Sequence, residues 1–192
     1  MERTLCKKCE GTGKFLDRFI PFAGGSMGFS FPAAVGFALA KKLKNEEGII
    51  YCLMSDGEMQ IGTTWESALI AAHHKLNNLI VIVDSNGFQA MGEIEDILDI
   101  GEGKHHDIEI KTSLWDKWLS FDWDVKHLSG HNYSNIHNRF SYENEFPRNK
   151  PLVFIAQTIK GMGVSFMEGE NLFHYKQLSK EEYDNALQEL NG

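Results

Sequence analysis

An acidic and an amide side chain each follow an apolar run of this sequence. Asp56 and Gly57 end the run that starts at Ile49, and Asn86 follows the run that starts at Leu79. One carboxylate and one amide oxygen, with backbone carbonyls nearby, are hard oxygen donors that suit Mg²⁺ or Ca²⁺ rather than zinc. A Mg²⁺ ion held by so few protein groups usually takes phosphate oxygens as its remaining ligands. The pair therefore predicts a site for a divalent metal and a diphosphate.

The two apolar runs must be neighbouring strands if they are to bring these side chains together. Residues 49–54 and 79–83 are short, continuous and apolar, which is typical of buried strands in a parallel sheet. The segment between them carries an apolar stripe at helical spacing, formed by Trp65, Leu69, Ala72 and Leu76. Strand, helix and strand make a right-handed βαβ crossover, and neighbouring strands lie about 5 Å apart. We expect Asp56 and Asn86 in one crevice, where open α/β sheets bind ligands.

Glycine-containing turns could supply the backbone contacts that a diphosphate needs. At Gly57 the backbone can approach a phosphate more closely than it could at a residue with a side chain. Residues 25–28, Gly-Ser-Met-Gly, offer a second phosphate cradle at a helix N-terminus. The helix is predicted from the spacing of Phe31, Val35, Ala38, Leu39 and Leu43. Asp-Gly and Asn-Gly are also ordinary turn dipeptides after strands, so the specificity of the prediction comes from the joint pattern.

At these motifs the sequence closely resembles the diphosphate-binding domain of transketolase. The stretches that carry the resemblance are GSMG (25–28), SDGEMQ (55–60), WESA (65–68), HKLNNL (74–79) and DSNGFQ (84–89). It continues in TIKGMGVSFME (158–168), His174 and EEY (181–183), which look like the end of the N-terminal subunit of a split transketolase. The resemblance covers roughly Gly24 to Leu190, most of the chain.

The resemblance implies a fold, a domain organisation and a set of site residues. The fold is α/β, with a doubly wound, mostly parallel sheet and helices on both faces; residues 1–24 form a short N-terminal segment and residues 25–192 the thiamine-diphosphate-binding domain. The cofactors are thiamine diphosphate and Mg²⁺ (or Ca²⁺), the metal being held by the Asp56 carboxylate, the Asn86 side-chain oxygen and the Phe88 backbone carbonyl. Further cofactor contacts are Gly25, Met27, Gly57 and Glu58. His174 is the catalytic candidate, because it aligns with a histidine that faces the cofactor or substrate.

The same resemblance implies that this chain is half of an enzyme. In the family, a glutamate on a separate pyrimidine-binding domain protonates the cofactor's aminopyrimidine, and the sequence shows no such domain. The expected partner is therefore a C-terminal, pyrimidine-binding transketolase subunit, with active sites at the interface. The expected assembly is a heterotetramer, or a dimer of diphosphate-binding chains. The expected reaction transfers a two-carbon ketol unit between sugars or sugar phosphates.

Three departures from the family pattern bear on the substrate. Only 24 residues precede Gly25 and none is histidine, although split transketolases carry sugar-binding histidines in a longer N-terminal region. Ile61 stands where the family has a glutamate that couples the two active sites. Residues 101–110 look like an insertion. These departures keep two alternatives open: the α-type subunit of a 2-oxo acid dehydrogenase or decarboxylase, and a catalytically silent scaffold of the same fold. Residues 160–163 favour transketolase.

Composition excludes several other classes. With 192 residues, 42% of them hydrophobic, the chain can form one α/β domain with a full core. Its 19 basic and 27 acidic residues leave a net charge of -8, which argues against a nucleic-acid or anionic-membrane surface. No apolar stretch is long enough to span a bilayer and no signal peptide is recognisable, so we expect a cytoplasmic protein. The turn at 25–28 lacks the spacing of a nicotinamide-binding motif.

The remaining pattern predicts the other elements and the state of the cysteines. Residues 91–112 read as a long polar loop that contains His105 and His106, followed by helices and strands near 114–119, 123–128, 133–142 and 152–157. A final helix runs from 179 to 190, with Ser179 as N-cap and Glu182 at the capping-box position. Cys6 and Cys9 provide two of the four ligands that structural zinc needs. Cys52 falls in a core strand, where cysteine behaves as a small hydrophobic residue.

Overall fold

The computed structural model describes residue 22 and residues 24–98, 114–145 and 148–191. Their elements, in chain order, are α2 (Ser30–Leu43), β1 (Ile50–Ser55), η1 (Asp56–Gln60), α3 (Gly62–His73), β2 (Leu79–Ser85), β3 (Phe88–Gln89), β4 (Gly92–Glu93), α4 (Ile94–Leu98), α5 (Leu114–Ser120), β5 (Asp124–Ser129), α6 (Tyr133–Glu145), β6 (Leu152–Gln157), η2 (Asn171–His174) and α7 (Lys180–Asn191). The predictions for Cys6, Cys9, His105, His106 and the 101–110 insertion lie outside the described residues.

Four strands form one parallel sheet in the order β1-β2-β6-β5. The predicted neighbouring strands are confirmed: β1 pairs with β2 along its whole length, from Ile50 opposite Leu79 to Ser55 opposite Asp84. The predicted burial of β1 is wrong on one face, because β1 is an edge strand of this sheet and Tyr51 and Leu53 are exposed. Since both strands run the same way, Asp56 and Asn86 leave the sheet at the same edge. The central strand β6 is buried from Leu152 to Ala156, as expected for a strand covered on both faces.

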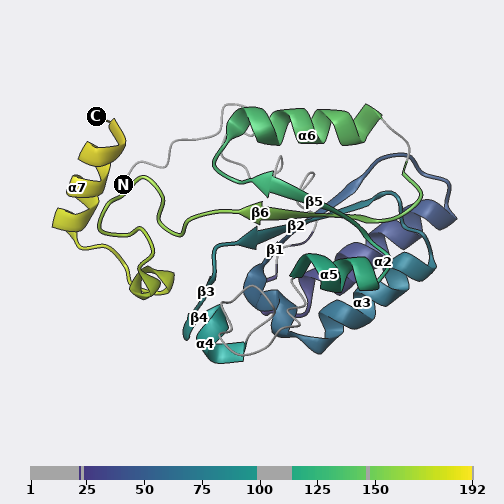
Figure 1. Cartoon of the computed structure of the whole chain (residues 1–192), viewed down its shortest axis with the longest axis horizontal. Coiled ribbons are helices and arrows are strands. Elements are labelled where there is room, and N and C mark those ends of the chain that lie inside the picture. Colours follow the sequence, from purple (N-terminus) through teal and green to yellow (C-terminus); the bar gives the residue numbers. More distant parts are fainter. Residues whose placement is uncertain (1–21, 23, 99–113, 146–147, 192) are drawn as a thin grey trace.

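Helices cover both faces of the sheet, which confirms the expected layered α/β architecture. Figure 1 shows α6 on one face and α2, α3 and α5 on the other. The larger core lies under the three helices, where Trp118 packs edge-on against Phe31 and Trp123 at ring-centroid distances of 6.0 and 4.8 Å. The smaller core lies under α6, where Phe140 packs on Phe154 at 4.9 Å. The strands that lead to the polar motifs are thus backed by packed apolar side chains.

The predicted apolar face of α3 is wrong in part. Leu69 is 57% exposed, whereas Ala68 and Ala71 are fully buried. The helix lies against α2 through these small side chains, and the indole N–H of Trp123 donates to the Ala68 carbonyl oxygen at 3.0 Å. Trp65 and Ala72 of the predicted stripe do pack against the core, and Leu76 is fully buried, so the prediction is wrong only at Leu69. The buried positions of α3 are small residues that the apolar pattern did not mark, namely Thr64, Ser67, Ala68 and Ala71.

Two further differences concern the second half of the chain. The segment predicted as a long polar loop from residue 91 begins with β4, which pairs with β3 just before it, and with the short helix α4, whose Ile94 is buried. After β6 the chain leads to η2 and then to α7, which lies apart from the sheet in Figure 1.

The capping box of α7 is confirmed, since Ser179 Oγ accepts from Glu182 N at 3.2 Å and Glu182 Oε2 accepts from Ser179 N at 2.8 Å. Among the described helices, none has the length and apolar character needed to cross a bilayer.

Candidate active site

The Asp56 carboxylate connects the ends of the two neighbouring strands. Its Oδ2 accepts hydrogen bonds from the backbone N–H groups of Asn86 and Gly87 at 3.0 and 2.7 Å, and its Oδ1 accepts from Gly57 at 2.8 Å. The two motifs therefore meet at the strand ends, as predicted, but the contact runs from the Asp56 carboxylate to the backbone of the Asn86 turn. The expected crevice is wrong in one respect, because neither Asp56 nor Asn86 lines the cavity at this edge of the sheet. Their role in holding a metal stays a prediction.

Asp56 is held in an environment that lacks a compensating cation. The residue is 1% exposed, and burial raises the pKa of its carboxyl to about 6. The three backbone hydrogen bonds lower this pKa, while the nearby negative charge of Asp84 raises it. Within the described part of the chain, no lysine, arginine or histidine pairs with Asp56. A buried carboxylate next to a second carboxylate is a site whose charge balance a divalent cation would improve.

The donor set around Asp56 fits a hard cation that shares phosphate oxygens. Asn86 folds its side chain back, so that its Oδ1 accepts from Phe88 N at 2.9 Å and lies on the same turn as Gly87, whose φ is +80°. The available donors are carboxylate, amide and backbone oxygens, the types that Mg²⁺ and Ca²⁺ prefer. The described residues contain no cluster of three or more histidine, cysteine, aspartate or glutamate side chains that could hold a metal.

The turn at residues 25–28 is fixed to the acidic motif by Glu58. The buried Glu58 accepts a 2.7 Å hydrogen bond from Gly28 N through its Oε1, and Thr63 Oγ1 donates to the Gly28 carbonyl at 3.0 Å. Gly28 has a φ of +84°, and a Cβ there would lie 2.8 Å from both Ile61 and Thr63. The predicted cradle therefore needs correction at one point, because the Gly28 N–H is already bonded to Glu58. Around Gly25, by contrast, the space is open.

These elements border a cavity of about 560 Å³. Six of the predicted site residues line it: Gly25, Met27, Gly57, Glu58, Phe88 and His174. Other parts of the wall come from Leu53 on β1 and from the β3–β4 hairpin. Asp56 and Asn86 do not line the cavity but hold the turn that leads into its wall. The structure thus brings widely separated parts of the sequence pattern to one place, at the carboxyl ends of β1 and β2.

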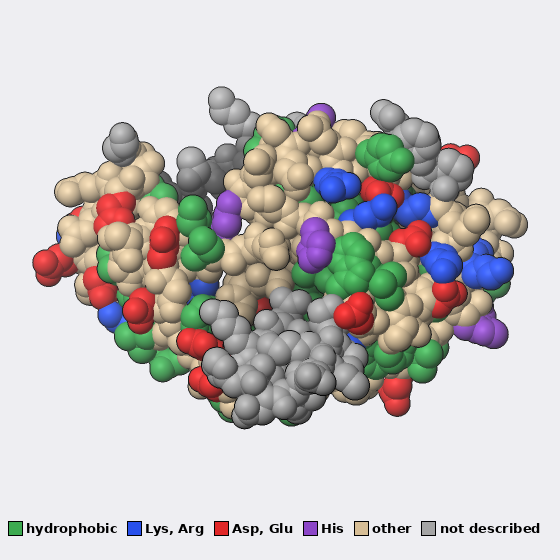
Figure 2. Space-filling model, in the orientation of Figure 1, with side chains coloured by type: hydrophobic (Ala, Val, Ile, Leu, Met, Phe, Trp, Pro, Cys, Tyr) green, Lys and Arg blue, Asp and Glu red, His purple; other side chains and the backbone are tan. Residues whose placement is uncertain are grey.

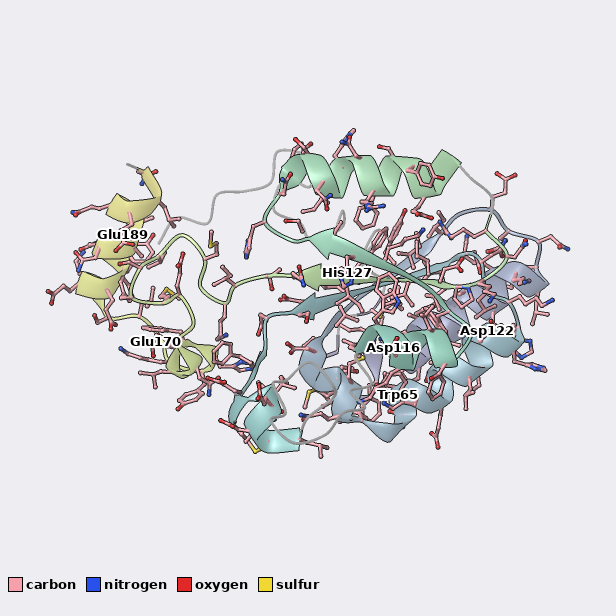
Figure 3. The ribbon with its side chains drawn as sticks, viewed as in Figure 1. Trp65, Asp116, Asp122, His127, Glu170 and Glu189 are labelled. Atoms are coloured by element: carbon pink, nitrogen blue, oxygen red, sulfur yellow. The ribbon has the colours of Figure 1, made fainter. Side chains whose placement is uncertain are left out.

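His174 reaches the cavity because η2 packs beside the β3–β4 hairpin. With its amide oriented so that nitrogen faces the Gln89 carbonyl (2.7 Å) and oxygen faces Gly92 N (3.2 Å), Asn171 bridges the two strands of the hairpin. Figure 3 labels Glu170, the residue before η2, on the segment that curves back toward β3 and β4. The sequence alone could place His174 at the site only through the family resemblance.

Sequence reasoning missed several residues of the cavity wall. Leu53, Met91 and Gln89 line it, although only Gln89 belonged to a motif and no role was assigned to it. Leu53 and Met91 are 71% and 73% exposed, so the cavity has an apolar rim on the surface. In Figure 2, by comparison, acidic side chains gather over α7 with a few basic ones among them, and more of the basic ones lie toward the opposite end of the molecule. The role of Leu53 could not be predicted from the sequence, because its run of apolar residues indicates a buried strand and only the fold shows that this side chain is exposed beside the cavity.

The chain has a parallel α/β sheet, and its strand ends hold an acidic and an amide motif beside a cavity. This arrangement is typical of domains that bind a small phosphorylated cofactor. Comparison with known proteins identifies its family: the family described as "Transketolase, thiamine diphosphate binding domain" matches residues 3–191. The chain belongs to the transketolase family, as the sequence motifs predicted.

Known proteins of this family show how much of a longer subunit the chain matches. It is 38% identical over 166 residues to a subunit of the apulose-4-phosphate transketolase of Actinobacillus succinogenes, covering 86% of this chain and 55% of that protein. It is 34% identical over 171 residues to "6-deoxy-6-sulfo-D-fructose transketolase subunit SqwG" of a Clostridium species, covering 89% and 58%. The chain thus spans little more than half the length of these relatives.

The structural comparison supports the same fold. The transketolase of Campylobacter jejuni superposes with a TM-score of 0.75 at 28% identity, over 88% of this chain and 26% of that one. The thiamine-diphosphate-binding fold expected from the sequence is therefore confirmed.

Proposed function

We propose that this chain is the diphosphate-binding part of a two-chain, transketolase-like transferase that moves a two-carbon ketol unit between sugars or sugar phosphates. The observation that carries the proposal is the cavity at the carboxyl ends of β1 and β2, where the Asp56 and Asn86 motifs meet and six predicted site residues form the wall. Membership of the family gives the reaction class. The relatives' own substrates, apulose 4-phosphate and 6-deoxy-6-sulfofructose in their names, suggest an unusual sugar as donor.

In this proposal thiamine diphosphate would occupy the cavity, and Mg²⁺ would bind at the Asp56 and Asn86 turn that leads into the cavity wall. The cofactor supplies the nucleophilic carbon that accepts the ketol unit. Asp56, Asn86 and the Phe88 carbonyl hold the metal, Gly25 and Gly57 contact the cofactor through backbone, and Met27 packs on it. Glu58 has a positioning role: its Oε1 accepts a hydrogen bond from Gly28 N and so keeps residues 25–28 at the cavity edge. His174, which also lines the cavity, would orient the sugar or move a proton on it.

The partner in this proposal is a chain that carries the pyrimidine-binding domain. The apolar rim formed by Leu53, Met27 and Met91 supports it, because exposed apolar side chains around a cavity mark a surface that another protein covers. The names of the relatives, which describe them as subunits, also support a two-chain assembly. We propose a heteromer in the cytoplasm, where the buried thiol of Cys52, whose pKa burial raises to about 12, stays unreactive.

Binding calorimetry tests the proposal. Wild-type chain is titrated with thiamine diphosphate and Mg²⁺, alone and with the pyrimidine-domain chain, and ketol transfer is then assayed in the mixture. Asp56→Ala should weaken the metal-dependent affinity at least about 100-fold. Asp184→Ala, which removes an exposed carboxylate from α7, should bind normally. Binding without turnover would indicate a silent scaffold, and absence of binding in both states would refute the proposal.

A further inference from the structure

The chain that leaves β6 leads to His174, and the start of this path is bonded to the ends of both strands that flank β6. Thr158 N donates to the carbonyl oxygen of Ser85, at the end of β2, at 3.2 Å. Gln157 O accepts from Gly130 N, in the turn after β5, at 2.9 Å. A Cβ added to Gly130 would lie only 2.3 Å from Thr158 Cγ2, so this turn needs glycine to approach the end of β6 so closely. The exit of β6 is therefore held between its two neighbours.

The next residue of the path, Ile159, is held by a side chain. Its backbone N–H donates to Nε2 of His131 at 2.7 Å. An imidazole nitrogen accepts a hydrogen bond only when it carries no proton, so this bond requires a neutral ring with its proton on Nδ1. The turn that carries the ring is itself bonded to β5 and α6. Asn132 N donates to the Ser129 carbonyl oxygen at 3.0 Å, and Asn132 Oδ1 accepts from Asn135 N, in α6, at 2.9 Å.

The segment between Ile159 and η2 is closed on itself, so the position of its base sets where η2 starts. Gly169 N donates to the Lys160 carbonyl oxygen at 2.9 Å, which closes the loop formed by residues 160–169. The base of this loop directly follows Ile159, and η2 begins two residues after the loop closes. His174, the last residue of η2, lines the cavity at the strand ends.

We propose that His131 is a positioning residue, which holds His174 at the cavity wall through Ile159 and the closed loop. This inference rests on the proposed function, because it gives His131 a part in the step that His174 would serve. His131 lines a second cavity, of about 510 Å³, and not the one that His174 lines, so it can act only through the segment between them. Without the acceptor, the Ile159 N–H bonds to water and the base of the loop gains freedom. A small displacement of a group that orients a substrate is enough to slow a reaction strongly.

Two variants separate the acceptor from the ring. His131→Phe keeps an aromatic ring and removes the acceptor, whereas His131→Gln places an amide oxygen at about the distance of Nε2 and so restores it. In the cofactor-free chain, the amide of Ile159 should exchange with solvent deuterium about tenfold faster in the phenylalanine variant than in wild type. The glutamine variant should exchange at about the wild-type rate. This measurement requires neither cofactor nor partner.

Kinetics in the complex with the pyrimidine-domain chain test the link to His174. His131→Phe should lower kcat/KM for ketol transfer about tenfold and leave the Kd for thiamine diphosphate unchanged, and His131→Gln should recover most of the loss. In a His174→Ala background, assayed at higher protein concentration, His131→Phe should cause no further loss, because the side chain that it positions is gone. A residue that only stabilises the fold would lower activity by the same factor in both backgrounds.

His137→Phe is the matched control. His137 is also an exposed histidine, and its ring lies beside that of Tyr133 on the same helix, α6, at a centroid distance of 6.1 Å. Its replacement should leave both the exchange at Ile159 and the rate of ketol transfer unchanged.

Three outcomes would overturn the inference while the proposed function stands: wild-type exchange or wild-type turnover in His131→Phe, no recovery in His131→Gln, or an equal loss in the His174→Ala background. If the wild-type chain binds no thiamine diphosphate with or without the pyrimidine-domain chain, the proposed function fails and the inference fails with it. Support consists of faster exchange at Ile159, a loss of kcat/KM that glutamine restores, and no loss beyond that of His174→Ala.

Discussion

Asp56 is a buried acid whose protonation competes with the metal that we propose. Its pKa of about 6 results mainly from burial, since three backbone N–H groups stabilise the charged form and only partly offset the loss of water. The cation that improves the charge balance of the site must displace the proton from the carboxyl group. In the proposed site, the protonation state of this one side chain would link cofactor loading to pH.

We predict that apparent Mg²⁺ affinity in the presence of thiamine diphosphate falls as the pH falls through about 6. Below the pKa the carboxyl binds a proton, so each further pH unit should weaken the metal about tenfold, while above it the affinity should level off. Calorimetric titrations at pH 5, 6, 7 and 8 measure this dependence. Asp56→Asn, which cannot ionise, should show weak affinity at every pH. A wild-type affinity that is equal at pH 5 and pH 7 would contradict the role of Asp56 as a metal ligand.

At the scale of elements, the turn before α2 requires glycine at position 28, because a side chain does not fit there. Gly28 combines a positive φ with contacts that leave no space for a Cβ, and its N–H bonds to Glu58. The turn, η1 and the start of α3 are therefore one unit, with Glu58 and Thr63 reaching across to Gly28. A change in the turn should reach the cofactor site through this unit.

Gly28→Ala should lower the free energy of unfolding by about 1–3 kcal/mol, because alanine is strained at this φ and its Cβ would press on Ile61 and Thr63. The affinity for thiamine diphosphate should fall as well, since the Glu58 bond positions residues 25–28. Gly36→Ala is the control: this exposed glycine lies within α2 with open space at its Cβ position, so alanine should stabilise the chain by up to about 1 kcal/mol. Chemical denaturation and calorimetry measure both effects, and equal behaviour of the two variants would contradict the prediction.

The elements also show what could be predicted from sequence and what could not. The strands β1 and β2 were predictable because continuous apolar runs followed by Asp-Gly and Asn-Gly have one common explanation in a parallel sheet. The capping box of α7 was predictable because it is local. The buried face of α3 was predictable only in part, because the spacing marks Trp65 and Ala72 but not the small buried residues Ala68 and Ala71. The β3–β4 hairpin, with two residues in each strand, is too short to produce a periodic pattern.

The candidate site likewise contains residues that the sequence could predict and residues that only the fold reveals. Asp56, Asn86 and their meeting point followed from strand order, whereas the place of His174 depends on a contact between η2 and the hairpin, which are far apart in sequence. The hydrogen bond between His131 and Ile159 joins the ends of two strands and has no sequence signature. Residues that act through their neighbours were thus visible only in the fold.

At the scale of the whole molecule, the cavity is open on a side that carries exposed apolar residues. Met91 lies at the tip of the β3–β4 hairpin, and Leu53 lies on β1, whose exposed side chains alternate with the buried ones. Both line the cavity, so a protein that covers them would also complete its wall. This arrangement agrees with the proposal that a second chain completes the cavity wall.

We predict that Met91→Ser weakens association with the pyrimidine-domain chain about tenfold, because a side chain that is 73% exposed in the free chain would lose its apolar contacts in the complex. Leu43→Ser is the matched control. Leu43 is 74% exposed, but it is the last residue of α2, whereas the cavity is lined by Ser30 at the first residue of that helix. Sedimentation or calorimetry of the two chains measures the affinities. Cofactor binding to saturated complexes then separates docking from site damage: Met91→Ser should recover normal binding once the partner is in excess. If both serine variants associate like wild type, the rim is not the docking surface, and the partner must cover the cavity through the rest of the wall.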